Sequence, residues 1–287
     1  MPYAPSKNAQ LYYEDTGRGT PIVFVHEFSG DLRSWEDQIR HFSRRYRCIA
    51  FNARGYPPSD VPKSWTKYSQ AIATEDITAV MRHLGLRKAH IIGCSMGAAA
   101  TLHFGLNYPR MAQSLTLIGA GSGSGSGSEP KKRNAFLRQT AIRASEFETL
   151  PLQDIAKSYR NAPNRVQLLH KNPRAWHEFW VRFCEHSGLG HANTLRGIQA
   201  RRPAIQSLTR GLRRLKVPLH VVVGDEDESA LDAGLFIKRN CAASRLTVVP
   251  ATGHVVNLEE PADFNRITDE FLALVESRRW RPRVNIK

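Results

Sequence analysis

The sequence has few cysteines and no long apolar run. Its four cysteines, Cys48, Cys94, Cys184 and Cys241, form no CxxC pair and show no metal-ligand spacing, so we expect reduced thiols in a cytoplasmic protein. The longest apolar runs are strand-sized and far below the ~18 residues that a membrane span requires. The first ten residues also lack the charged-then-apolar pattern of a secretory signal. The sequence therefore predicts neither a disulfide scaffold nor a membrane protein.

Acidic residues are scarce relative to basic ones, and the imbalance is local. The net charge is +15, with 41 Lys and Arg against 26 Asp and Glu. Residues 129–216 hold 18 basic and 6 acidic side chains, and Glu276–Lys287 holds 5 and 1, so the remainder is nearly neutral. No helix-turn-helix, zinc-finger or RRM-type motif accompanies this charge. It predicts at most non-specific, salt-sensitive nucleic-acid binding, and we expect a small-molecule substrate as the partner.

Short apolar runs alternate with helical patterns at both ends of the chain. Runs that are apolar on both faces are typical of a mostly parallel sheet between helices. The predicted strands are Ile22–His26, Cys48–Asn52, His90–Gly93, Leu115–Gly119, Leu219–Gly224 and Leu246–Pro250. The predicted helices are Ser34–Arg45, Ser69–Leu84, Met96–Tyr108 and Pro261–Arg278. This order predicts a doubly wound α/β fold with its site at the carboxyl ends of the strands.

The middle of the chain has only helical periodicity, interrupted by prolines. We therefore predict a core made of residues 1–128 and 217–287, with residues 129–216 inserted between two strands as a helical cap. A Gly-Ser alternation at 121–128 leads into the insertion. Such a stretch is flexible by composition, and it is either a natural hinge or an introduced change.

Gly93-Cys94-Ser95-Met96-Gly97 is the strongest local motif. It follows a predicted strand and opens a predicted helix, which is the setting of a nucleophile elbow. The glycines flank Ser95 because the turn leaves no room for side chains on either side. Cys94 beside it is interpreted as a packing residue that points away from the position of the serine hydroxyl.

A serine hydroxyl needs a base to remove its proton. His254 is the candidate, because it lies on a loop after a predicted strand and before a new helix, whereas most other histidines lie within helical patterns. The base in turn needs an acid to orient it. The acidic run after Val223 offers one in the required chain order, and strand geometry alone does not choose between Asp225 and Asp227.

Over nearly its whole length the sequence resembles the α/β-hydrolase superfamily, in its capped serine-hydrolase, esterase and enol-lactonase-like branch. The matching stretches are Phe24-Val25-His26, Asn52-Ala53-Arg54-Gly55-Tyr56, Gly93 to Gly97, the acidic turn after Val223, and Gly253-His254 with Asn257-Leu258-Glu259-Glu260-Pro261. The resemblance implies that Asp227 is the acid of the triad. It also implies that the backbone amides of Phe28 and Met96 form the oxyanion hole.

Glu27 departs from this family, which usually has glycine after the early histidine. One interpretation is that Glu27 caps or hydrogen-bonds its own loop. The alternative is that it touches the nucleophile or substrate, as in the dienelactone-hydrolase group, which also carries a glutamate in this loop. A carboxylate at this position would disfavour an oxyanion unless it is turned away, paired or protonated.

Two groups of side chains in the insertion are candidates for substrate binding. Trp176, Phe179, Trp180 and Phe183 recur at helical spacing and are either cap core or the lining of an acyl pocket. Arg196, Arg201 and Arg202 are either a solvated face or a clamp for a substrate carboxylate. We count Glu27, Trp176, Trp180, Arg196 and Arg201 as candidate substrate-binding residues.

The predicted activity is hydrolysis of a carboxylic ester or lactone through an acyl-enzyme on Ser95, with an anionic substrate favoured by the basic insertion. The alternatives are a C–C bond hydrolase of a ring-cleavage product and a non-catalytic binding scaffold, against which the intact Ser, His and acid argue. This chemistry requires no metal or organic cofactor, and no phosphate loop or dinucleotide fingerprint is present. The sequence makes no prediction of oligomeric state.

Overall fold

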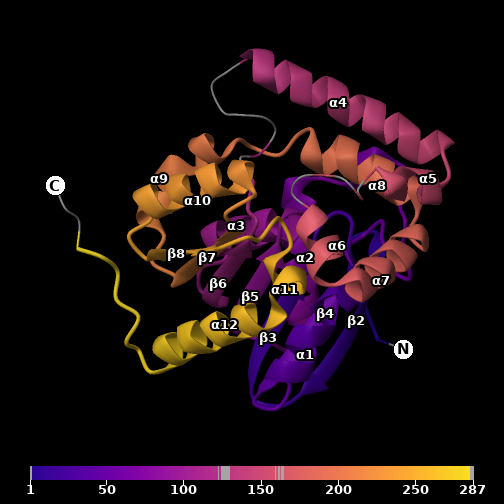
Figure 1. Ribbon diagram of the computed structural model, residues 1–287. Coiled ribbons are helices and arrows are strands. Elements are labelled where there is room, and N and C mark those ends of the chain that lie inside the picture. The colour runs from indigo at the N-terminus through magenta and orange to yellow at the C-terminus, as the bar shows by residue number, and fades with distance from the viewer. Residues whose placement is uncertain are drawn as a thin grey trace.

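A computed structural model of the chain describes residues 2–121, 123, 130–158, 160, 162 and 165–284. Its eight-stranded sheet has the order β1-β2-β4-β3-β5-β6-β7-β8 (Figure 1). The strands are β1 (Tyr3–Ser6), β2 (Ala9–Gly17), β3 (Thr20–Val25), β4 (Tyr46–Phe51), β5 (Ala89–Cys94), β6 (Ala112–Ile118), β7 (Leu219–Gly224) and β8 (Ser244–Val249). Strands β3 to β8 pair in parallel, which confirms the predicted α/β fold class.

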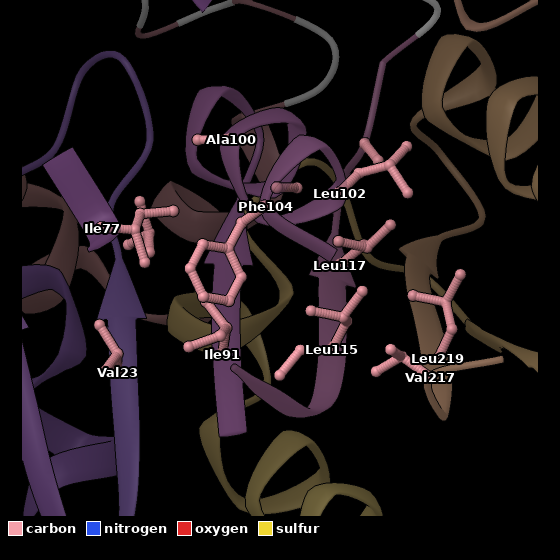
Figure 2. Packing of buried hydrophobic residues seen from close by; sticks show 14 of the residues in the cluster. Val23, Ile77, Ile91, Ala100, Leu102, Phe104, Leu115, Leu117, Val217 and Leu219 are labelled. Atoms are coloured by element: carbon pink, nitrogen blue, oxygen red, sulfur yellow. The ribbon is translucent and has the colours of Figure 1, made fainter. Parts of the chain in front are cut away.

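Helices cover both faces of the sheet. Successive side chains of a strand point to opposite faces, and here both sets are apolar and need to be buried. Val23 packs with Ile77 and Phe104 on one face, as Figure 2 shows, whereas Phe24 packs with Phe42 and Phe264 on the other. The first face carries α2 (Gln70–His83), α3 (Met96–Asn107) and α10 (Glu228–Asn240). The second carries α1 (Glu36–Phe42) and α12 (Pro261–Glu276), with the short α11 (Val256–Glu259) just before α12.

Strands β1 and β2 and helix α10 were not predicted from the sequence. Strands β1 and β2 form an antiparallel edge, and the second half of β2 is exposed, so no continuous apolar run marks it. The buried residues of α10 do recur at helical spacing, but Ala230, Ala233 and Gly234 are small and leave a weak apolar stripe. Elements of this kind depend on their neighbours for burial and are hard to recognise locally.

All described elements between β6 and β7 are helical, as predicted. They are α4 (Pro130–Thr149), α5 (Leu152–Lys157), α6 (Val166–Lys171), α7 (Pro173–Cys184), α8 (Gly188–Thr194), a π-helical turn (Leu195–Gln199), a 3₁₀ turn (Ile205–Leu208) and α9 (Thr209–Arg214). Ile205 and Leu212, near the end of this stretch, pack into the core cluster of the sheet. The cap boundaries at 129 and 216 stay a prediction, and the Gly-Ser stretch lies mostly outside the described residues.

Candidate active site

Ser95 stands in a strained turn between β5 and α3. Its φ of 51° and ψ of −108° are unfavourable for a residue with a side chain. Its N–H donates to the Ile118 carbonyl at 2.8 Å, which ties the turn to the end of β6. A Cβ at Gly93 would lie 2.3 Å from the Gly97 carbonyl oxygen, and a Cβ at Gly97 would lie 2.1 Å from that of Val25. Both glycines are therefore required by close backbone approach.

His254 contacts a buried carboxylate. It lies on the loop between β8 and α11, and its Nδ1 donates to Oδ2 of Asp227. Burial would raise the pKa of Asp227, but the hydrogen bond and charge of His254 outweigh burial and lower it. Asp227 is therefore an anion that fixes the imidazole with Nδ1 protonated. This arrangement leaves Nε2 available for a second partner.

Asp225, the other candidate acid, has a different environment. Its side chain is exposed, and its Oδ1 accepts the Thr252 N–H at 3.1 Å. This bond stabilises the loop that leads to His254 without reaching the imidazole ring. The structure therefore brings Asp227, and not Asp225, together with His254.

Ser95 and His254 line the same cleft of about 290 Å³. Its other lining residues are Glu27, Phe28, Ser29, Phe136, Thr140, Arg143, Ala162, Arg165, Leu195 and Gln199. Phe28, one predicted oxyanion donor, is thus at the cleft. Met96, the other, is the first residue of α3, so its N–H has no acceptor within the helix. The catalytic and oxyanion roles of these residues stay predictions.

Glu27 is buried, and it hydrogen-bonds its own loop, as the first interpretation expects; a contact with the nucleophile or substrate stays a prediction. Its Oε2 accepts the Ser29 N–H at 2.8 Å, which caps the loop, and it also accepts Nη2 of Arg165 at 2.8 Å. Burial would raise the pKa of Glu27, but the adjacent Arg165 and the Ser29 amide outweigh burial and lower it. The carboxylate is therefore ionised, paired and part of the cleft wall.

The candidate substrate-binding residues of the insertion do not line the cleft that holds Ser95 and His254. Trp176 and Trp180 line a different surface cleft, and neither is among the described residues around Ser95. Arg196 binds both carboxylate oxygens of Glu148. The guanidinium of Arg201 lies 4.3 Å from the ring centroid of Trp65. Spacing along a helix indicates which side chains lie on the same face of that helix. Only tertiary packing decides which face lines the cleft.

Arg202, the third arginine of that cluster, is buried beside α3 and does not line the cleft of Ser95. Burial lowers its pKa to about 10. Cys94, interpreted from sequence as a packing residue, is buried in the core cluster on the α1 and α12 face. Burial raises the pKa of its thiol well above the ordinary value, so the thiol is protonated and does not compete with Ser95 as a nucleophile.

Several residues at this site were not predicted from the sequence, and three of them are charged. Arg143 and Arg165 line the cleft, but neither stands in a motif, and many arginines of the insertion looked equivalent. Glu259 accepts the N–H groups of Gly253 at 2.6 Å and Val255 at 3.2 Å, and so brackets His254. Its position five residues after His254, just before the helix predicted from Pro261, was the available signal.

No helix among the described residues is both long and apolar enough to traverse a bilayer. No cluster of three or more His, Cys, Asp or Glu side chains in the described part of the chain is arranged to bind a metal ion.

Comparison with known proteins identifies the family. Residues 20–261 match the model of the alpha/beta hydrolase fold family. The chain is 25% identical over 262 residues to the putative 2-succinyl-6-hydroxy-2,4-cyclohexadiene-1-carboxylate synthase of Bacillus subtilis (strain 168), covering 88% of this chain and 90% of that protein. It is 26% identical over 272 residues to the 2-hydroxy-6-oxo-6-phenylhexa-2,4-dienoate hydrolase of Burkholderia cepacia, covering 93% and 92%.

Among solved structures, the enol-lactonase from Burkholderia xenovorans LB400 superposes with a TM-score of 0.81 at 20% identity, covering 95% of this chain and 100% of that one. At this identity the likeness concerns the fold. Because the family model spans most of the chain, the protein belongs to the alpha/beta hydrolase fold family. Together with its named hydrolase relatives, this makes it a hydrolytic enzyme.

Proposed function

We propose that the protein is a serine hydrolase that cleaves a carboxylic ester or lactone through an acyl-enzyme. The observation that carries this proposal is the bond between the buried Asp227 and the half-buried His254, which lines the same cleft as Ser95. Ser95 in turn stands in a strained elbow at the start of a helix. A binding scaffold has no physical need for this combination.

The proposed mechanism begins with attack of Ser95 Oγ on the acyl carbonyl carbon while His254 Nε2 takes the hydroxyl proton. Asp227 stabilises the resulting imidazolium. The amides of Phe28 and Met96 stabilise the oxyanion, and each such donor is typically worth about 10²–10³ in rate. His254 then protonates the departing alkoxide. It next activates water, which releases the acid and restores Ser95.

We further propose that the helices of residues 129–216 form a lid that selects an anionic substrate. Arg143 and Arg165 are contributed to the cleft by this segment. Part of their charge is already balanced, because Arg143 pairs with Glu146 and Arg165 with Glu27. The preference for an anion is therefore expected to be moderate.

The second candidate is hydrolysis of a C–C bond in a ring-cleavage product. The observation that favours it is the similarity to the Burkholderia cepacia hydrolase along almost the whole of both chains. The same triad would serve both reactions, so the residues do not separate them. Turnover of 2-hydroxy-6-oxo-6-phenylhexa-2,4-dienoate at a rate well above that of simple esters would favour the second candidate.

The first test is fluorophosphonate labelling of the wild type and Ser95→Ala, with hydrolysis of matched p-nitrophenyl esters that differ only by a terminal carboxylate. We expect labelling and turnover in the wild type, and loss of both in Ser95→Ala, with kcat reduced by about 10⁴-fold or more. Higher kcat/KM for the carboxylate-bearing ester would support the anionic substrate. A wild type that takes no label and turns over neither ester nor ring-cleavage product would contradict the hydrolase mechanism and favour the scaffold.

A further inference from the structure

Three hydrogen bonds hold the two peptide groups on either side of Phe28. The Phe28 carbonyl accepts the Tyr56 hydroxyl at 2.7 Å. The backbone carbonyl of the preceding residue, Glu27, accepts a hydrogen bond from Nδ1 of His26 at 2.7 Å. Ser29 after it donates its N–H to Glu27 Oε2 at 2.8 Å. His26 binds the backbone carbonyl of Glu27, so only the Ser29 bond uses the Glu27 side chain. Through that bond the side chain helps to set the direction of the Phe28 amide.

The same Glu27 oxygen also binds the helical segment between β6 and β7. Nη2 of Arg165, just before α6, lies 2.8 Å from Oε2, and both side chains are buried. The Arg165 guanidinium also lies 5.3 Å from the ring centroid of Phe179 in α7. One carboxylate oxygen therefore joins the loop after β3 to the lid segment.

A carboxylate at this position is electrostatically unfavourable for the proposed reaction. An oxyanion at the Phe28 amide would lie close to the negative charge of Glu27, and like charges repel strongly where water is excluded. Oε1 of Glu27 has no hydrogen-bond partner among the described residues. The charged or titratable groups that influence Glu27 or share its surroundings are Arg165, His254, His26 and the Cys94 thiol. Of these, Arg165 binds the carboxylate directly.

We infer that Arg165 is a positioning residue of the oxyanion site: it neutralises Glu27 and holds the loop so that the Phe28 amide faces the cleft. The oxyanion site is then complete only when the lid segment is docked on the core. This inference rests on the proposed serine-hydrolase function. It assigns to a lid arginine a role in stabilising the transition state that is separate from substrate binding.

The test is a double-mutant cycle with Arg165→Gln, Glu27→Gln and the double variant, measured on a neutral p-nitrophenyl ester. We expect Arg165→Gln to lower kcat by about 10²-fold with little change in KM, because the lost interaction acts on the transition state. The loss should deepen as pH rises, because the buried Glu27 without its partner ionises at higher pH than usual. The double variant should recover most of the loss, since it removes the unpaired charge.

A trifluoromethyl ketone that mimics the oxyanion provides a second readout. Its affinity should change in parallel with kcat/KM across the three variants, falling in Arg165→Gln and recovering in the double variant. A purely structural defect would not follow this order. Arg165→Lys retains the charge and should show no added pH dependence. The matched control is Arg174→Gln, an exposed arginine of α7 that pairs with Glu178 and should behave as the wild type.

Two outcomes would overturn the inference. One is an Arg165→Gln variant within twofold of the wild-type kcat. The other is a folded double variant that is as slow as Arg165→Gln alone. If Arg165→Gln does not fold, as judged by circular dichroism, the pH profile of Arg165→Lys and the inhibitor affinity of the double variant decide. Absence of Ser95-dependent turnover in the wild type would instead reject the proposed function itself.

Discussion

At the scale of single residues, the choice between two aspartates on one turn depends on burial. Asp227 is buried and bonded to His254, whereas Asp225 is exposed and bonded to the backbone of Thr252. In the first environment a carboxylate orients a ring and stabilises its charge. In the second it only supports a loop.

We therefore expect two matched substitutions to differ strongly in their effect on kcat. Asp227→Asn should lower kcat by about 10⁴-fold, because an amide in its place favours the wrong imidazole tautomer and does not stabilise the imidazolium. Asp225→Asn should change kcat by less than about tenfold, because the amide oxygen still accepts the Thr252 N–H. Steady-state kinetics on one p-nitrophenyl ester measures both. Equal losses in the two variants would contradict the assignment of Asp227.

Glutamates show the same dependence on surroundings. Glu259 is buried with its oxygens on the amides that flank His254, and burial raises its pKa despite these bonds. Glu27 is buried as well, but Arg165 lowers its pKa. The difference is the guanidinium partner, and nothing in the residue types or their local sequence distinguishes the two cases.

At the scale of elements, the site is assembled where strands end. Ser95 follows β5, Asp227 lies in the turn between β7 and α10, and His254 lies on the loop after β8. The residue directly after strand β6 is Gly119, which has a φ of +56° and leaves room beside the imidazole because it has no side chain. A Cβ there would lie 3.1 Å from Nδ1 of His254. The end of β6 therefore needs glycine both for its backbone and for the imidazole.

Gly119→Ala tests this requirement. We expect kcat to fall by at least about tenfold, because the new methyl group crowds the ring that binds Asp227, together with about 1–2 kcal/mol lost from the free energy of unfolding. Gly85→Ala is the control, because its φ is +67° but no atom lies within 4 Å of the added Cβ. It should lose similar stability and keep its kcat. A Gly119→Ala enzyme with normal kcat would contradict the argument.

At the scale of the whole molecule, one buried and one half-buried histidine link the free energy of unfolding to pH. Burial lowers the pKa of His220 to about 4, and its Nε2 lies 2.8 Å from the Thr247 hydroxyl. Burial, followed by the charge of Arg202, lowers the pKa of His103 to about 4. In the unfolded chain both have a pKa of about 6.5. Below that pH the unfolded chain binds more protons than the folded one, so stability is lost.

We predict that the free energy of unfolding falls as pH decreases from about 6.5 towards about 4. The slope from one fully buried histidine is at most about 1.4 kcal/mol per pH unit. Urea denaturation of the wild type and His220→Gln at about pH 7 and about pH 5 measures it. The variant should be less stable at the higher pH and show the shallower dependence. A slope that is identical in the two proteins would exclude His220 as a source.

Much of the fold could be predicted from the sequence because strands β3 to β7 are largely buried on both faces and therefore consist of nearly continuous apolar runs. The elbow was recognisable for a similar reason, since tight backbone approach at Gly93 and Gly97 admits no other residue. Half-exposed β2 and the small-residue stripe of α10 carry weaker patterns, and both were missed. A local apolar pattern indicates which side chains of that segment are buried. It does not indicate which neighbouring elements cover a segment with a weak pattern.

The sequence by itself determined the α/β class, the strand and helix order around the elbow, and the positions of Ser95 and His254 along the chain. Only the tertiary structure decided which aspartate meets His254, that Arg165 and not Arg196 reaches the cleft, and that Glu27 is paired. The physical reason is that spacing sets the directions of side chains within one element. Contacts between residues far apart in the chain, such as Glu27 and Arg165, depend on how separate elements dock.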